Sequence, residues 1–225
     1  MFQRVVYRWR LWSYWVAANT ALGVTPDPKE FERIFEAYGS AGRFHHSYDH
    51  IVFGVNFVGS HAFYGVSWYD AALLQLGFFY HDVVYDPAAP HGSNEQASAN
   101  MFRSYLANSR VSNRDIDRVS GFILNTQDHQ NAIGGGMWDL FNDADLMILA
   151  STDKTYRKYA DNVWQEYKSF VSRPDFVRGR VKILEQFLTK PVFRNKYFMD
   201  TRELVANKNM KAELQRLREE EKSFA

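Results

Sequence analysis

Apolar residues recur along most of the chain at the three- and four-residue spacing of amphipathic helices, and the alternation typical of strands is nearly absent. The fold class that this pattern predicts is all-α, a single-domain helical bundle of about eight or nine helices with short loops. The ranges that matter most for chemistry are 46–58, 67–85, 93–107, 112–126 and 137–150.

Helix starts are marked by short polar side chains placed just before the apolar pattern. Asp27 stands before Pro28 and Lys29, and Ser67 stands three residues before Asp70. Ser93 and Ser112 begin similar capping patterns. These signals predict separate helices from about residues 28, 68, 93 and 112.

The predicted helix 67–85 is apolar almost all round, so we expect it to be central and buried. Near its end, His81 and Asp82 stand side by side in an otherwise apolar run from Phe78 to Tyr85. Burying such a pair costs several kcal/mol unless something compensates, and a bound cation would do so. This run therefore predicts a metal site.

Composition narrows the kinds of function. The 225 residues contain no cysteine, so any metal must be held by His, Asp and Glu, which suits Mn, Fe, Mg, Co or Zn. A net charge of +1 disfavours extended binding of nucleic acid. No run of about twenty apolar residues exists, so we expect a cytoplasmic protein without a membrane segment.

Further candidate ligands lie on neighbouring helices. His46 and His50 are one helical turn apart in the range 46–58, which favours His46 over His45 as the inward residue. In the range 137–150 only one of Asp143 and Asp145 can face inward. The apolar stripe of that helix includes the position of Asp145, so we expect Asp145 to be the ligand.

The order His50, His81-Asp82, Asp145 resembles the H…HD…D signature of the HD superfamily of metal-dependent phosphohydrolases. Several longer motifs look like the predicted HD phosphohydrolase family of bacteria. They are Arg43-Phe44-His45-His46-Ser47-Tyr48-Asp49-His50, Phe79-Tyr80-His81-Asp82-Val83-Val84-Tyr85-Asp86, Asn94-Glu95-Gln96-Ala97-Ser98-Ala99 and Asp143-Ala144-Asp145-Leu146.

That resemblance implies a single HD-type domain over residues 1–225, with its core at about 40–190 and the terminal helices packed on it. It also implies a divalent metal ion held by His50, His81, Asp82 and Asp145. Cyclic nucleotide phosphodiesterases have a similar His-x-x-x-His arrangement. By that likeness His46 is the general acid, and Asp82 has a catalytic role through a water that bridges to a second metal.

Three other residues have two possible roles each. Glu95 is either a helix cap or a ligand of a second metal, and His129 is either a loop residue or a contact to a second metal or a phosphate. Arg43 either binds a phosphate or pairs with a nearby carboxylate.

The function expected is hydrolysis of a nucleotide or another small phosphate ester by a metal-activated water. Two alternatives stay open: an HD-type di-iron oxygenase, and a non-catalytic nucleotide-binding module that keeps a structural metal. The partner expected is a small phosphorylated substrate, and oligomerisation stays open.

Overall fold

The computed structural model describes residues 2–60, 65–129 and 135–224, and all regular elements in these ranges are helices. The all-α fold class is therefore confirmed. The described ranges contain ten α-helices, so the predicted count of eight or nine was too low. No helix in the described ranges is long and apolar enough to cross a membrane.

Contacts within the chain define two compact units, Met1–His129 and Gln130–Ala225, and each is described by itself. The predicted single HD-type domain over residues 1–225 stays a prediction. The first unit contains α1 (Phe2–Ala21), α2 (Pro28–Tyr38), α3 (Tyr48–Gly59), α4 (Trp68–Tyr80), α5 (Ser93–Leu106) and α6 (Asn113–Asn125), followed by the 3-10 turn η2 (Thr126–Asp128). The second contains α7 (Met137–Leu146), η3 (Met147–Ala150), α8 (Asp153–Tyr167), α9 (Arg173–Phe187), α10 (Lys196–Glu221) and η4 (Lys222–Phe224).

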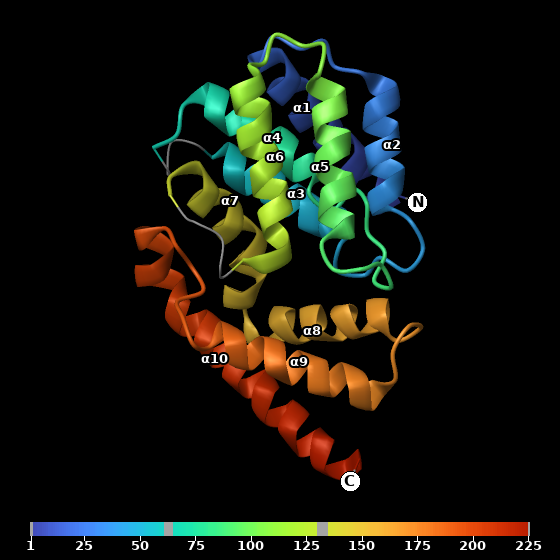
Figure 1. Ribbon diagram of the computed structural model, residues 1–225, viewed down its shortest axis with the longest axis vertical. Coiled ribbons are helices and arrows are strands. Elements are labelled where there is room, and N and C mark those ends of the chain that lie inside the picture. The colour runs from blue at the N-terminus through green and yellow to red at the C-terminus, as the bar shows by residue number, and fades with distance from the viewer. Residues whose placement is uncertain (1, 61–64, 130–134, 225) are drawn as a thin grey trace. The chain divides into compact units, whose positions relative to one another are not determined.

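Helix α4 is the centre of the first unit, where it contacts α1, α3, α5 and α6 (Figure 1). Nine of its thirteen residues are buried, which confirms that this helix is apolar nearly all round and central. The helix begins as predicted, because the Ser67 hydroxyl accepts a hydrogen bond from the backbone N–H of Asp70.

Helices α3 and α4 approach each other closely at Gly54. A Cβ atom placed on Gly54 would lie 1.8 Å from Cε1 of Phe78, so no residue larger than glycine fits without a shift of that ring. His50 lies one turn before Gly54 on α3, and His81 follows α4 directly. The close approach therefore determines how near the two histidines come.

The end of α4 differs from the prediction. The helix ends at Tyr80 rather than at about Tyr85, so His81 and Asp82 lie in a turn that follows it. The backbone N–H of Val83 bonds the carbonyl of Tyr80 at 3.0 Å, and that of Val84 bonds the Ser98 hydroxyl on α5 at 3.1 Å. The Ser98 hydroxyl thus accepts a backbone N–H that would donate to a carbonyl of the same helix if α4 continued to Tyr85.

In the second unit, α10 packs against α8, α9 and η3. A buried polar cluster joins three of these helices, since Glu213 of α10 accepts hydrogen bonds from Tyr156 of α8 at 2.5 Å and from Arg180 of α9 at 2.9 Å. Nη2 of Arg180 also lies 3.3 Å from the Tyr159 hydroxyl. The Arg180 cation and the Glu213 anion therefore face each other, and the Tyr156 hydroxyl adds a hydrogen bond to the carboxylate.

Candidate metal centre

Three predicted ligands come together in the first unit. His50 lies in the first turn of α3, and His81 and Asp82 follow the last residue of α4. One ligand atom from each lies within 4.8 Å of the others, so the group could hold a metal ion. Both imidazoles are buried, and the Asp82 side chain is partly buried.

The donor atoms form a small triangle. Nε2 of His50 lies 2.9 Å from Nε2 of His81, which is itself 2.9 Å from Oδ2 of Asp82, and the third side, from His50 Nε2 to Asp82 Oδ2, is 3.4 Å. Ligands about 2.1 Å from an ion lie about 3.0 Å apart at right angles and about 3.4 Å apart in a tetrahedron. The observed sides of 2.9, 2.9 and 3.4 Å lie within about 0.1 Å of these values, so the residues fit a divalent cation.

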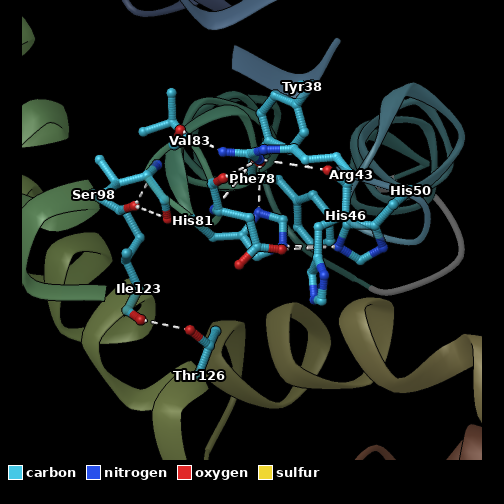
Figure 2. Close-up of polar contacts among 12 residues, drawn as sticks. Tyr38, Arg43, His46, His50, Phe78, His81, Val83, Ser98, Ile123 and Thr126 are labelled. Carbon is cyan, nitrogen blue, oxygen red and sulfur yellow. Dashed lines mark hydrogen bonds and ion pairs between the residues drawn. The ribbon is translucent and has the colours of Figure 1, made fainter. Parts of the chain in front are cut away.

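Hydrogen bonding sets the tautomer of His81. Its Nδ1 lies 2.8 Å from the carbonyl oxygen of Phe78, which can only accept, so Nδ1 carries the proton. In the neutral ring, Nε2 then presents a lone pair to His50 and Asp82. Figure 2 shows the His81 and His50 side chains side by side. A backbone carbonyl on the far nitrogen is the usual support of a metal-bound histidine.

Asp82 is held as a carboxylate. Burial raises the pKa of its carboxyl, but the positive charges of His81 and His46 and hydrogen bonds from His50 and His81 lower it more, and the pKa lies well below the ordinary value. A neutral His81 would bring its Nε2 lone pair against this carboxylate. The arrangement therefore requires positive charge at the centre, supplied by protons or by a cation.

The turn that carries Asp82 is fastened at several points. Its backbone N–H donates to the Tyr38 hydroxyl at 3.3 Å, and its carbonyl accepts from Nη1 of Arg43 at 2.6 Å. Two residues of α5 hold the following stretch: Ser98 accepts from Val84, and Asn94 exchanges two hydrogen bonds with the backbone of Asp86.

Neither His45 nor His46 lies on α3. The helix begins at Tyr48, with Ser47 as its N-cap, so the predicted start at His46 was two residues too early and the helical-turn argument for His46 does not apply. The His45 ring is 5.0 Å from the His50 ring and the His46 ring is 5.9 Å away, centroid to centroid. The His46 ring lies against Tyr85, at 4.2 Å. His46 as the general acid stays a prediction.

The predicted ligand Asp145 belongs to the second unit, on α7, and stays a prediction because the two units are described separately. The stripe argument that chose it over Asp143 was wrong about burial: Asp143 is fully buried and Asp145 is partly exposed. Asp143 accepts backbone N–H bonds from Arg194 at 2.9 Å and Asn195 at 2.8 Å. Burial raises the pKa of Asp143 to about 7, although these bonds lower it.

The remaining candidates lie outside the three-residue group. Glu95 is in the first turn of α5, whose N-cap is Gly92 and not Ser93 as predicted. Gly92 has a φ of 79°, a conformation that glycine adopts without strain. His129 directly follows η2 at the end of the first unit. A second metal held by Glu95 or His129 stays a prediction.

Sequence reasoning missed the residues that hold the Asp82 turn. Tyr38 is the last residue of α2 and had no role in the prediction. Ser98 and Asn94 stand four positions apart on α5, inside the motif from Asn94 to Ala99. A spacing of four places both side chains on one helix face, and this was the available signal that they act together.

Comparisons with protein-family models, curated proteins and solved structures yield no match for this chain. The HD-superfamily resemblance therefore depends on the motifs and on the three-residue group alone.

Proposed function

We propose that the protein is a metal-dependent phosphohydrolase that acts on a nucleotide or another small phosphate ester. The observation that carries the proposal is the triangle of two imidazole nitrogens and one carboxylate oxygen, whose sides of 2.9, 2.9 and 3.4 Å suit a divalent cation. His50, His81 and Asp82 would hold this cation, with Asp145 as the proposed fourth ligand.

Two of the three residues have features that suit this role. The Phe78 carbonyl keeps the proton of His81 on Nδ1, which leaves Nε2 for the metal. Asp82 supplies the carboxylate oxygen of the group, 2.9 Å from Nε2 of His81. When bound, a divalent cation lowers the pKa of a water to near neutral and polarises a phosphoryl oxygen.

His46 is the proposed general acid. Oxygen from water forms the new bond to phosphorus, the bond from phosphorus to the ester oxygen breaks, and the departing oxygen takes a proton from the His46 ring. A proton released from the attacking water then restores the imidazolium. The Tyr85 ring, 4.2 Å from the His46 ring, would orient the imidazole for this transfer.

The test is elemental analysis of the purified protein, followed by assays of nucleoside mono-, di- and triphosphates with Mn²⁺, Mg²⁺, Co²⁺, Fe²⁺ and Zn²⁺. His81→Ala and Asp82→Ala should lose bound metal and turnover. The matched control is His91→Ala, since His91 is exposed and lies outside the group. Normal turnover in either ligand variant would refute the proposal.

The same experiment separates the alternatives. Two iron atoms per chain, with one lost in His129→Ala, would favour a di-iron oxygenase. Tight binding of nucleotides without turnover of any ester would favour a non-catalytic module with a structural metal.

A further inference from the structure

Arg43 lies in the loop that connects α2 to α3, and its guanidinium reaches the turn that follows α4. Nη1 donates to the carbonyl of Asp82 at 2.6 Å, and Nη2 donates to the carbonyl of Val83 at 2.9 Å (Figure 2). Nη1 also lies 3.4 Å from the carbonyl of His46. A single side chain thus bonds the backbone of both segments that carry candidate site residues.

Two aromatic rings lie close to this guanidinium. Its central carbon lies 5.2 Å from the ring centroid of Tyr38 and 5.4 Å from that of Tyr85. Rings at such distances attract the cation and restrict its rotation. The Tyr38 hydroxyl accepts the N–H of Asp82, so Tyr38 and Arg43 together bond both backbone polar groups of this residue.

The consequence concerns Asp82 in particular. His50 is held within helix α3. Asp82, by contrast, lies in the turn that follows α4, where its backbone is not part of a helix. Its carboxylate must stay 2.9 Å from His81 Nε2 for the triangle to persist, and movement of the backbone by one ångström would open it. The direct bond from Arg43 to the Asp82 carbonyl opposes that movement.

We propose that Arg43 is a positioning residue of the metal site: it fixes the Asp82 turn, and the loop of His46 beside it, through backbone carbonyls. This inference rests on the proposed function, because it assumes that the triangle binds a cation. It differs from the phosphate contact considered for Arg43 from sequence, since both Nη groups are directed at the protein's own main chain.

The test compares Arg43→Lys and Arg43→Ala with the wild-type chain by calorimetric titration with Co²⁺ and by the visible absorption of bound Co²⁺. A lysine cannot donate to two carbonyls from one planar group, so it should not rescue the site. We expect Co²⁺ affinity to fall about tenfold to hundredfold in both variants, as for other residues that support metal ligands. The Co²⁺ spectrum should change, which a loss of stability alone would not cause.

Two controls keep the result specific. Arg103→Lys, in α5, alters an arginine that pairs with Asp117 at the surface and should leave Co²⁺ affinity unchanged. Guanidinium ion added to Arg43→Ala, far below denaturing concentrations, should restore part of the affinity, whereas sodium chloride at equal ionic strength should not. Such rescue shows that the folded variant lacks only the missing group.

The outcomes that overturn the inference are distinct from those that overturn the proposed function. If the wild-type chain binds Co²⁺ and both variants bind it within twofold with the same spectrum, Arg43 does not position the site. Weaker inhibition by inorganic phosphate with unchanged Co²⁺ affinity would instead make Arg43 a phosphate contact. If the wild-type chain binds no Co²⁺, the proposed function fails and this inference fails with it.

Discussion

The two units each bury a polar cluster, and the clusters are of opposite kinds. In the second unit, Arg180 and Glu213 face each other as a cation and an anion, and the Tyr156 hydroxyl donates to the same carboxylate. In the first unit, His50 and His81 present ring nitrogens to each other and to Asp82, so two imidazole nitrogens and a carboxylate oxygen meet. The first arrangement pairs opposite charges, whereas the second brings together atoms that can bind a metal ion.

This difference separates a structural cluster from a candidate site. A buried ion pair with additional hydrogen bonds needs nothing from outside the chain. A triangle of two imidazole nitrogens and a carboxylate oxygen requires added positive charge, either as protons or as a metal ion. Burial of polar groups therefore does not by itself indicate function, but the gathering of several atoms that can bind a metal ion does.

The largest effect on stability should follow from breaking the cluster of Arg180, Glu213 and Tyr156. Arg180→Met removes the cation and leaves the Glu213 carboxylate buried with only hydroxyl support, so we expect a loss of about 3–5 kcal/mol in the free energy of unfolding. Urea denaturation monitored by circular dichroism would measure it. Co²⁺ affinity should stay unchanged, because Arg180 is not part of the metal group.

Arg178→Met is the matched control for this prediction. Arg178 lies on the same helix, but it pairs with Asp175 at the surface, where such pairs contribute about 0–1 kcal/mol. Equal losses in the two variants would mean that the Arg180 cluster is not the buried anchor that its contacts indicate.

The cluster of His50, His81 and Asp82 should respond to metal instead. Co²⁺ at a free concentration about a hundred times its Kd should stabilise the wild-type chain by about 2.7 kcal/mol, because only the folded state presents the triangle. His50→Ala should abolish this increment, and His91→Ala should retain it. Thermal unfolding with Co²⁺ and with a chelator measures the difference. A metal-dependent increment that persists in His50→Ala would place the ion elsewhere.

Helix starts could be predicted because their signals are local. Asp27, Ser67 and Ser112 all accept hydrogen bonds from the backbone N–H groups of the first turn, as their positions before apolar segments indicate. The end of α4 could not be predicted in this way. Arg43 and Ser98 take up backbone groups of the following turn, and they are about 40 and 14 positions away.

The site was predicted in part. His50, His81 and Asp82 could be chosen because polar residues in apolar surroundings stand out in sequence. The choice between Asp143 and Asp145 could not be made from periodicity, since α7 buries residues around most of its circumference. Asp143 is buried because the backbone N–H groups of Arg194 and Asn195, far along the chain, bond its carboxylate.

A smaller effect should follow from moving α3 away from α4, because His50 lies on α3 and His81 and Asp82 directly follow α4. Gly54→Ala places a methyl group against the Phe78 ring, which also lies 5.7 Å from His50 and 4.3 Å from His81, centroid to centroid. Overpacking of this kind costs about 1–3 kcal/mol. We expect that loss together with weaker Co²⁺ binding. Gly121→Ala, with nothing within 4 Å of the added Cβ, should lower neither; weakened binding there would contradict this explanation.

The smallest effect should come from the hydroxyl of Tyr38. Tyr38→Phe keeps the ring beside Arg43 but removes the acceptor for the Asp82 N–H, so we expect a loss of about 1 kcal/mol in stability. Co²⁺ affinity should fall less than in Arg43→Lys, because the carbonyl of Asp82 stays bonded to the guanidinium. Urea denaturation and Co²⁺ titration of both variants provide the ranking. If Tyr38→Phe weakened Co²⁺ binding more than Arg43→Lys, the N–H of Asp82, rather than its carbonyl, would be the main point of attachment.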